Sequence, residues 1–75
     1  MRTLSELKQG SEAEITGINC GKDFSRRLCD LGIFEGTKLT VMKNDNFGPI
    51  IIHVLNSKIA IGRGEASKIH AKTLN

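Results

Sequence analysis

Four side chains in this 75-residue chain belong to types that bind transition metals: Cys20, Cys29, His53 and His70. A structural zinc or iron site needs roughly three or four such ligands that converge on one point. The two cysteines form no Cys-x-x-Cys pair, and the two histidines fall on the expected outward faces of different strands. We therefore expect no metal site here and no bound cofactor, with Fe(II) or another divalent transition metal as the alternative.

Groups that could perform catalysis are not clustered in the sequence either. No Ser–His–Asp set and no pair of carboxylates near a histidine is apparent. The segment Gly62-Arg63-Gly64 is too short for a phosphate-binding loop, which needs a longer glycine-rich run followed by Lys-Ser or Lys-Thr. We interpret it as a flexible break between strands, with insertion of Arg63 into a partner's nucleotide site as an alternative. The chain is predicted not to be an enzyme.

Composition restricts the class of partner. The chain is 39% hydrophobic and 25% charged, which suits one small domain over residues 1–75. With three Phe and no Trp or Tyr, it lacks the aromatic side chains on which single-stranded nucleic acid stacks. The net charge of +3 is spread without a basic run, so no nucleic-acid partner is expected. A small basic nucleic-acid-binding barrel remains the alternative.

The apolar runs are too short for a membrane segment. The longest, Pro49-Ile50-Ile51-Ile52, is far below the ~20 residues of a membrane span. The N-terminus lacks the apolar stretch of a signal peptide. We expect a cytoplasmic protein that does not insert directly into a membrane and whose cysteines are reduced.

Apolar and polar residues alternate with period two in several segments, which indicates short strands. Before the first of them, Thr3 and Glu6 form a capping box for one helical turn. Gly17 marks a bulge or bend. The predicted strands cover residues 12–18, 37–43, 50–55, 58–61 and 69–72, with a hairpin tip at 44–49, a tight turn at 56–57 and a helical turn at 65–67.

One substantial helix is predicted over Asp23–Leu31, because Phe24, Leu28 and Leu31 recur at i, i+4 and i+7 and so share a face. Gly32 ends it, since glycine readily adopts the left-handed conformation of a helix C-terminus. About five short strands with one helix after the first predict a mainly β fold, a small SH3-like barrel. An OB-fold is the competitor, but its helix usually follows the third strand.

The segment Arg26–Gly36, RRLCDLGIFEG, resembles the R-x-L-x-x-L-G-[ILM]-x-x-G signature of the ferrous iron transport protein A (FeoA) family. The similarity continues through GPIII at 48–52, through IAI at 59–61 and through Glu65-Ala66 and Ile69. The sequence departs from the family pattern at Glu35, at 44–46 and at Gly62, where the usual Arg stands one place later.

This resemblance implies an SH3-like barrel with a cytoplasmic accessory role in bacterial or archaeal Fe(II) uptake. The partner that it implies is the membrane ferrous iron transporter FeoB, which carries a cytoplasmic GTPase region. The same module forms the C-terminal domain of iron-dependent repressors of the diphtheria toxin repressor family. A metal-responsive regulatory module that binds a divalent transition metal is therefore an alternative function.

Protein docking is the interpretation that we favour, because several apolar and basic residues fall on expected surfaces. Ile51 and Leu55 would also permit a weak homodimer, unless a loop or the N-terminal turn covers them. Phe34 is expected to pack in part against the helix, and Arg27 could pair with a local carboxylate, Asp23 or Asp30. The candidate partner-binding residues are Lys22, Arg26, Arg27, Phe34, Phe47, Ile51, His53 and Leu55.

Overall fold

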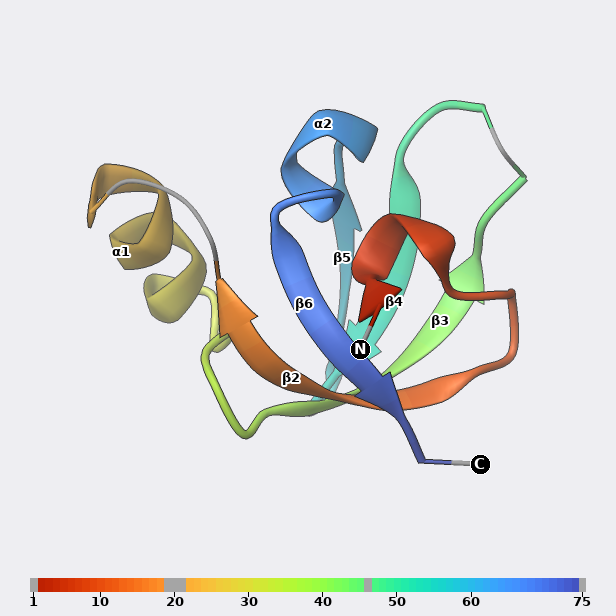
Figure 1. Ribbon diagram of the computed structural model, residues 1–75, viewed down its shortest axis with the longest axis horizontal. Helices are drawn as coiled ribbons and strands as arrows, with labels where there is room; N and C mark the ends of the chain where they lie inside the picture. Colours follow the sequence, from red (N-terminus) through yellow and green to blue (C-terminus); the bar gives the residue numbers. More distant parts are fainter. Residues whose placement is uncertain (1, 19–21, 46, 75) are drawn as a thin grey trace.

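The chain forms a strongly curved antiparallel sheet with two short helices on its outside (Figure 1). The computed structural model describes residues 2–18, 22–45 and 47–74, with backbone alone at 22–25. In chain order the elements are β1 (Arg2–Thr3), the 3-10 helix η1 (Leu4–Glu6), β2 (Glu12–Ile18), α1 (Lys22–Asp30), β3 (Lys38–Lys43), β4 (Ile50–Val54), β5 (Ser57–Ile61), α2 (Arg63–Ala66) and β6 (Ile69–Thr73).

Among the described residues, six strands pair in the order β1-β6-β2-β3-β4-β5, which confirms the mainly β prediction. The strand that the sequence did not indicate is β1, whose two residues pair with His70 and Ala71 of β6. Two residues are too few to show a period-two pattern, so this strand is visible only through its partner. The predicted bulge at Gly17 is confirmed, because the β2–β6 register shifts between Ile15 and Gly17.

The core follows from the alternation of the strands. Inward residues of β2, β3, β4 and β6 are buried, while their neighbours along each strand face outward. Burial of a single Ile, Leu or Val side chain contributes about 1.5–3 kcal/mol. The buried residues are Leu4, Leu7, Ala13, Ile15, Leu28, Ile33, Leu39, Val41, Ile50, Ile52, Val54, Ile61, Ala66, Ile69 and Ala71.

Helix α1 ends one residue earlier than predicted, and this changes which residue is buried. Gly32 has φ +87°, its N–H donates to the Cys29 carbonyl oxygen (2.9 Å), and the Ile33 N–H donates to the Leu28 carbonyl oxygen (2.8 Å). These two bonds form a Schellman motif, which turns Ile33 back onto Leu28. The prediction that Leu31 shares the inward face is therefore wrong: Leu31 is exposed and Ile33 takes the core position.

The segment Gly62-Arg63-Gly64 is not the flexible break that we expected. Gly62 is the N-cap of α2, which begins at Arg63 and buries Ala66 against the core. The second hairpin turn also shifts by one residue, because β5 already begins at Ser57. No helix in the part of the chain that the structure describes is long and apolar enough to cross a membrane.

Candidate docking surface

The candidate metal ligands do not meet in this fold. Cys29 is a free, exposed thiol on α1, whereas His53 and His70 lie half-buried on β4 and β6, which are not neighbours in the sheet. Cys20 lies outside the described residues. Within 2–18, 22–45 and 47–74, no three His, Cys, Asp or Glu side chains gather as metal ligands would.

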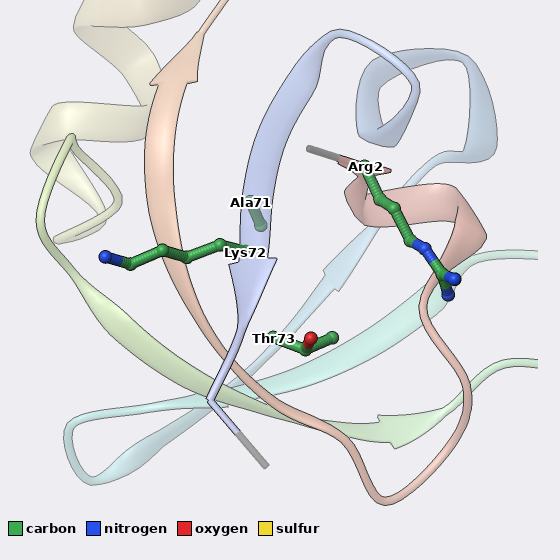
Figure 2. Close-up of a pocket in the computed structure, with 4 residues that line it drawn as sticks. All are labelled: Arg2, Ala71, Lys72 and Thr73. Atoms are coloured by element: carbon green, nitrogen blue, oxygen red, sulfur yellow. The ribbon is translucent and has the colours of Figure 1, made fainter.

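A shallow depression beside β6 is lined by Arg2, Ala71, Lys72 and Thr73. Two cations at one depression could suit an anion if they converged. Figure 2 shows instead that the side chains of Arg2, on β1, and Lys72, on β6, extend away from each other. The depression therefore has no pair of charges aimed at one ligand.

The outer face of β4 is less open than its sequence predicted. Ile51 and His53 are half-buried. Ile51 lies opposite Ala60, and His53 lies opposite Lys58. Leu55 does not continue this face, because it lies in the β4–β5 turn with φ +56°.

Three exposed apolar side chains lie around the end of α1, and we call them the apolar end: Leu31, Phe34 and Leu55, which are 54%, 51% and 78% exposed. Leu55 reaches this region across the fold, since its Cδ1 is 3.7 Å from the point where a Cβ on Gly32 would stand. Phe34 is half exposed, so the packing that we expected against the helix covers only part of it.

The loop of the apolar end is held by hydrogen bonds that are mostly local. The Thr37 hydroxyl donates to the Gly32 carbonyl oxygen (3.2 Å) and accepts from the Phe34 N–H (3.3 Å). The Gly36 N–H donates to the Ile15 carbonyl oxygen of β2 (2.7 Å). The backbone that carries Phe34 is thus fixed to the edge of the barrel.

Phe47 lies at a different place, in the β3–β4 loop (residues 44–49), and is 85% exposed. In Figure 1 this loop projects at the right of the molecule, whereas α1 lies at its left, along the longest axis. The structure therefore brings Phe34 and Leu55 into one region and places Phe47 in a second.

Basic side chains flank the apolar end. Arg26 and Arg27 are exposed on α1, while the side chain of Lys22 lies outside the described residues. The Arg27 Nη2 lies 3.2 Å from Glu65 Oε2 on α2, so this arginine pairs with a distant carboxylate instead of the local Asp30 that we considered. With 73% and 41% of the two side chains exposed, this pair contributes at most about 1 kcal/mol.

A polar network that the sequence did not indicate joins three segments at the root of the β3–β4 loop. Asn44 Nδ2 donates to the carbonyl oxygens of Ser5 (3.2 Å) and Leu7 (2.7 Å). Arg63 Nη2 donates to Asn44 Oδ1. The only sequence signal was that both positions depart from the family pattern. Arg63 is half-buried, which sets it apart from a side chain that is free to reach into a partner.

Comparison with known proteins decides the family, because the model of the FeoA domain matches residues 2–73. The chain belongs to the FeoA family. It is 45% identical over 69 residues to "Putative Fe(2+) transport protein A" of Methanocaldococcus jannaschii, a match that covers 92% of this chain and 83% of that protein.

Solved FeoA structures have the same fold. The crystal structure of an iron uptake regulatory protein (FeoA) superposes with a TM-score of 0.90 at 30% identity, covering 96% of each chain. Stenotrophomonas maltophilia FeoA complexed with zinc, described as a prokaryotic SH3 domain protein, gives a TM-score of 0.82 at 25% identity, covering 96% of this chain and 91% of the other. The SH3-like prediction is thereby confirmed.

Proposed function

We propose that this FeoA-family protein is a cytoplasmic accessory protein of ferrous iron uptake, which docks on the cytoplasmic GTPase region of the transporter FeoB. Family membership supports the pathway. The Stenotrophomonas maltophilia relative is itself proposed, in its description, to act as a ferrous iron transport activating factor. The observation that carries docking is that four large apolar side chains are more than half exposed: Leu31, Phe34, Phe47 and Leu55.

Exposed apolar side chains of this kind contribute favourable free energy when a partner removes them from water. Complete burial of a Phe or Leu contributes about 1.5–3 kcal/mol. Arg26 and Arg27 add positive charge beside the apolar end. A positive surface steers an acidic partner and raises the association rate more than the affinity. The partner surface that fits is thus apolar at its centre and acidic at its margin.

Two contact regions are proposed, and they differ in which candidates they include. The first combines the apolar end with Arg26 and Arg27 of α1. The second is the β3–β4 loop with Phe47. Ile51 and His53 contribute less in this proposal, because strands β3 and β5 already cover part of both side chains.

Calorimetric titration of the purified protein into the transporter's cytoplasmic GTPase region tests this function. We expect the variant Phe47→Ala/Arg26→Glu to bind at least about tenfold more weakly, because one variant loses an aromatic anchor and a steering charge. Leu74→Ala/Lys72→Glu is the matched control, since it truncates an exposed apolar residue and reverses an exposed charge elsewhere. Absence of binding by the wild type, or equal loss in the control, would contradict the proposal.

A further inference from the structure

The side chain of Asn44 holds the root of the β3–β4 loop through hydrogen bonds of both its amide nitrogen and its amide oxygen. Asn44 directly follows β3, and its amide nitrogen serves the carbonyl oxygens of Ser5 and Leu7. Its amide oxygen accepts from Arg63 of α2. An amide turned by 180° would set its oxygen against two carbonyl oxygens and its NH₂ against a guanidinium. The network therefore admits one orientation of Asn44.

The described part of the loop tip, residues 47–49, is exposed. Phe47 stands three positions after Asn44 and is almost fully exposed. A further contact at the root, the ion pair of Lys43 Nζ with Asp45 Oδ2 at 3.6 Å, is exposed and contributes little. Beyond the last β3–β4 pair, Lys43 with Ile51, Asn44 and the guanidinium that holds it help to set the direction in which the loop leaves the barrel.

The side chain of Arg63 includes one group that destabilises the fold. Its Nε is buried and has no hydrogen-bond partner among the described residues. A buried donor without a partner costs free energy that offsets the bond made by Nη2. An apolar side chain of similar length would keep the packing, remove the unpaired donor and lose the bond to Asn44. Stability and loop position can therefore be separated by one substitution.

We propose that Arg63 is a positioning residue for the β3–β4 loop. Through Asn44 it fixes the loop root against η1 and α2, so that Phe47 is presented in one place before a partner binds. A contact residue that is ordered in advance loses less conformational entropy on binding. The consequence for binding rests on the proposed docking function, whereas the consequence for loop order does not.

The first test needs only the free protein. We expect ¹⁵N relaxation to give lower order parameters at Phe47 and Gly48 in Arg63→Met than in wild type, with a nearly unchanged thermal midpoint. Arg63→Lys, which keeps a donor for Asn44 Oδ1, should restore most of the loop order. Glu65→Gln is the control on the same helix, because it removes only the Arg27 pair and should leave the loop as in wild type.

Unchanged order parameters in Arg63→Met would overturn the inference. Should this variant not fold, the same measurement on Asn44→Ser decides, since a serine hydroxyl is too short to bridge Arg63 and the carbonyl oxygens of Ser5 and Leu7. A loop as ordered in Asn44→Ser as in wild type would again overturn it.

The second test is a double-mutant cycle with the transporter's GTPase region. We expect Arg63→Met to weaken binding about threefold to tenfold, and to have no further effect in the Phe47→Ala background. Additive losses would overturn the inference while leaving docking intact. If the wild type does not bind at all, docking fails, and the relaxation data still decide whether Arg63 positions the loop.

Discussion

The two exposed regions of this protein are held in place by different means. The apolar end is carried by a loop whose side-chain bonds join near neighbours, with Gly32 in the left-handed conformation and Thr37 bonded back to it, while the Gly36 N–H also bonds Ile15 of β2. The β3–β4 loop is held by Asn44, which bonds residues 19 to 39 positions away in the sequence. One region is shaped mainly by local backbone geometry, and the other mainly by side-chain contacts that exist only after the barrel has formed.

This difference predicts how each region responds to substitution. A loop whose conformation is set locally should lose it when its own glycines or its buried residue are substituted. A loop whose conformation is set by side chains distant in the sequence should lose it when one of those side chains is substituted, even if the loop residues are unchanged.

The anchor of the apolar end is Ile33, which is fully buried, and its neighbour Phe34 is half exposed. We expect Ile33→Ala to lower the free energy of unfolding by about 2–5 kcal/mol, because it leaves a cavity beside Leu28. Urea denaturation followed by far-ultraviolet circular dichroism measures this, since the chain has no Trp or Tyr for fluorescence.

Phe34→Ala is the control for that anchor. It should change stability by less than about 0.5 kcal/mol and weaken partner binding instead. Equal destabilisation by the two variants would show that Phe34 is part of the core, and that the apolar end is not a surface available for docking.

Much of the fold was readable from local patterns in the sequence. Alternation identified β2, β3, β4, β5 and β6, and Gly17 identified the bulge. Strand β1 was not predicted, because two residues are too few to show a period-two pattern. The helical turn predicted at 65–67 corresponds to α2, but its start at Arg63 was not predicted, because glycine at 64 has poor intrinsic helix propensity, which packing of the buried Ala66 overrides.

The candidate surface was predictable only where it is locally encoded. Exposure of Phe34 and Phe47 followed from their turn positions. A helical wheel alone placed Leu31 inward, although a glycine at 32 followed by Ile33 is the pattern of a Schellman motif. The partnership of Asn44 with Arg63 had no sequence pattern, because side chains 19 positions apart meet only through the course of the sheet.

Substitution of Gly32 and of Gly64 by alanine should change the free energy of unfolding in opposite directions. Gly32→Ala should destabilise the protein by about 1–2 kcal/mol, because φ +87° is costly for a residue with a side chain. A Cβ there would meet only Leu55 at 3.7 Å, so backbone strain and not a clash sets the effect. The measurement is again the unfolding free energy by circular dichroism.

Gly64 of α2 provides the matched control, because a Cβ at this position would meet nothing within 4 Å. Gly64→Ala should stabilise the protein by up to about 1 kcal/mol through better helix propensity. If both variants destabilise equally, the left-handed conformation at Gly32 does not encode the loop of the apolar end.

Lowering the pH should have the smallest effect on stability, and this effect should reach the β3–β4 loop through η1. Glu6 Oε1 accepts from the Thr3 N–H (3.1 Å) and the Thr3 hydroxyl (2.9 Å), and the backbone bond above all holds the pKa of Glu6 below its ordinary value. A lowered pKa in the folded state stabilises the fold above the unfolded-state pKa, and this contribution is lost as pH falls through the folded value.

Stability of the wild type should therefore fall toward that of Glu6→Gln as the pH drops below about 4.3, and urea midpoints of the pair at pH 7, 5, 4 and 3 measure the convergence. Since Ser5 of η1 and Leu7 directly after it supply the two carbonyl oxygens that bind Asn44, the side-chain amide resonances of Asn44 should shift with the titration of Glu6. Backbone resonances of Gly32 and Thr37 should not follow that transition, because their bonds do not pass through η1. A common transition at both regions would mean that the two loops are not held independently, and the absence of a transition at Asn44 would mean that η1 does not hold the β3–β4 loop.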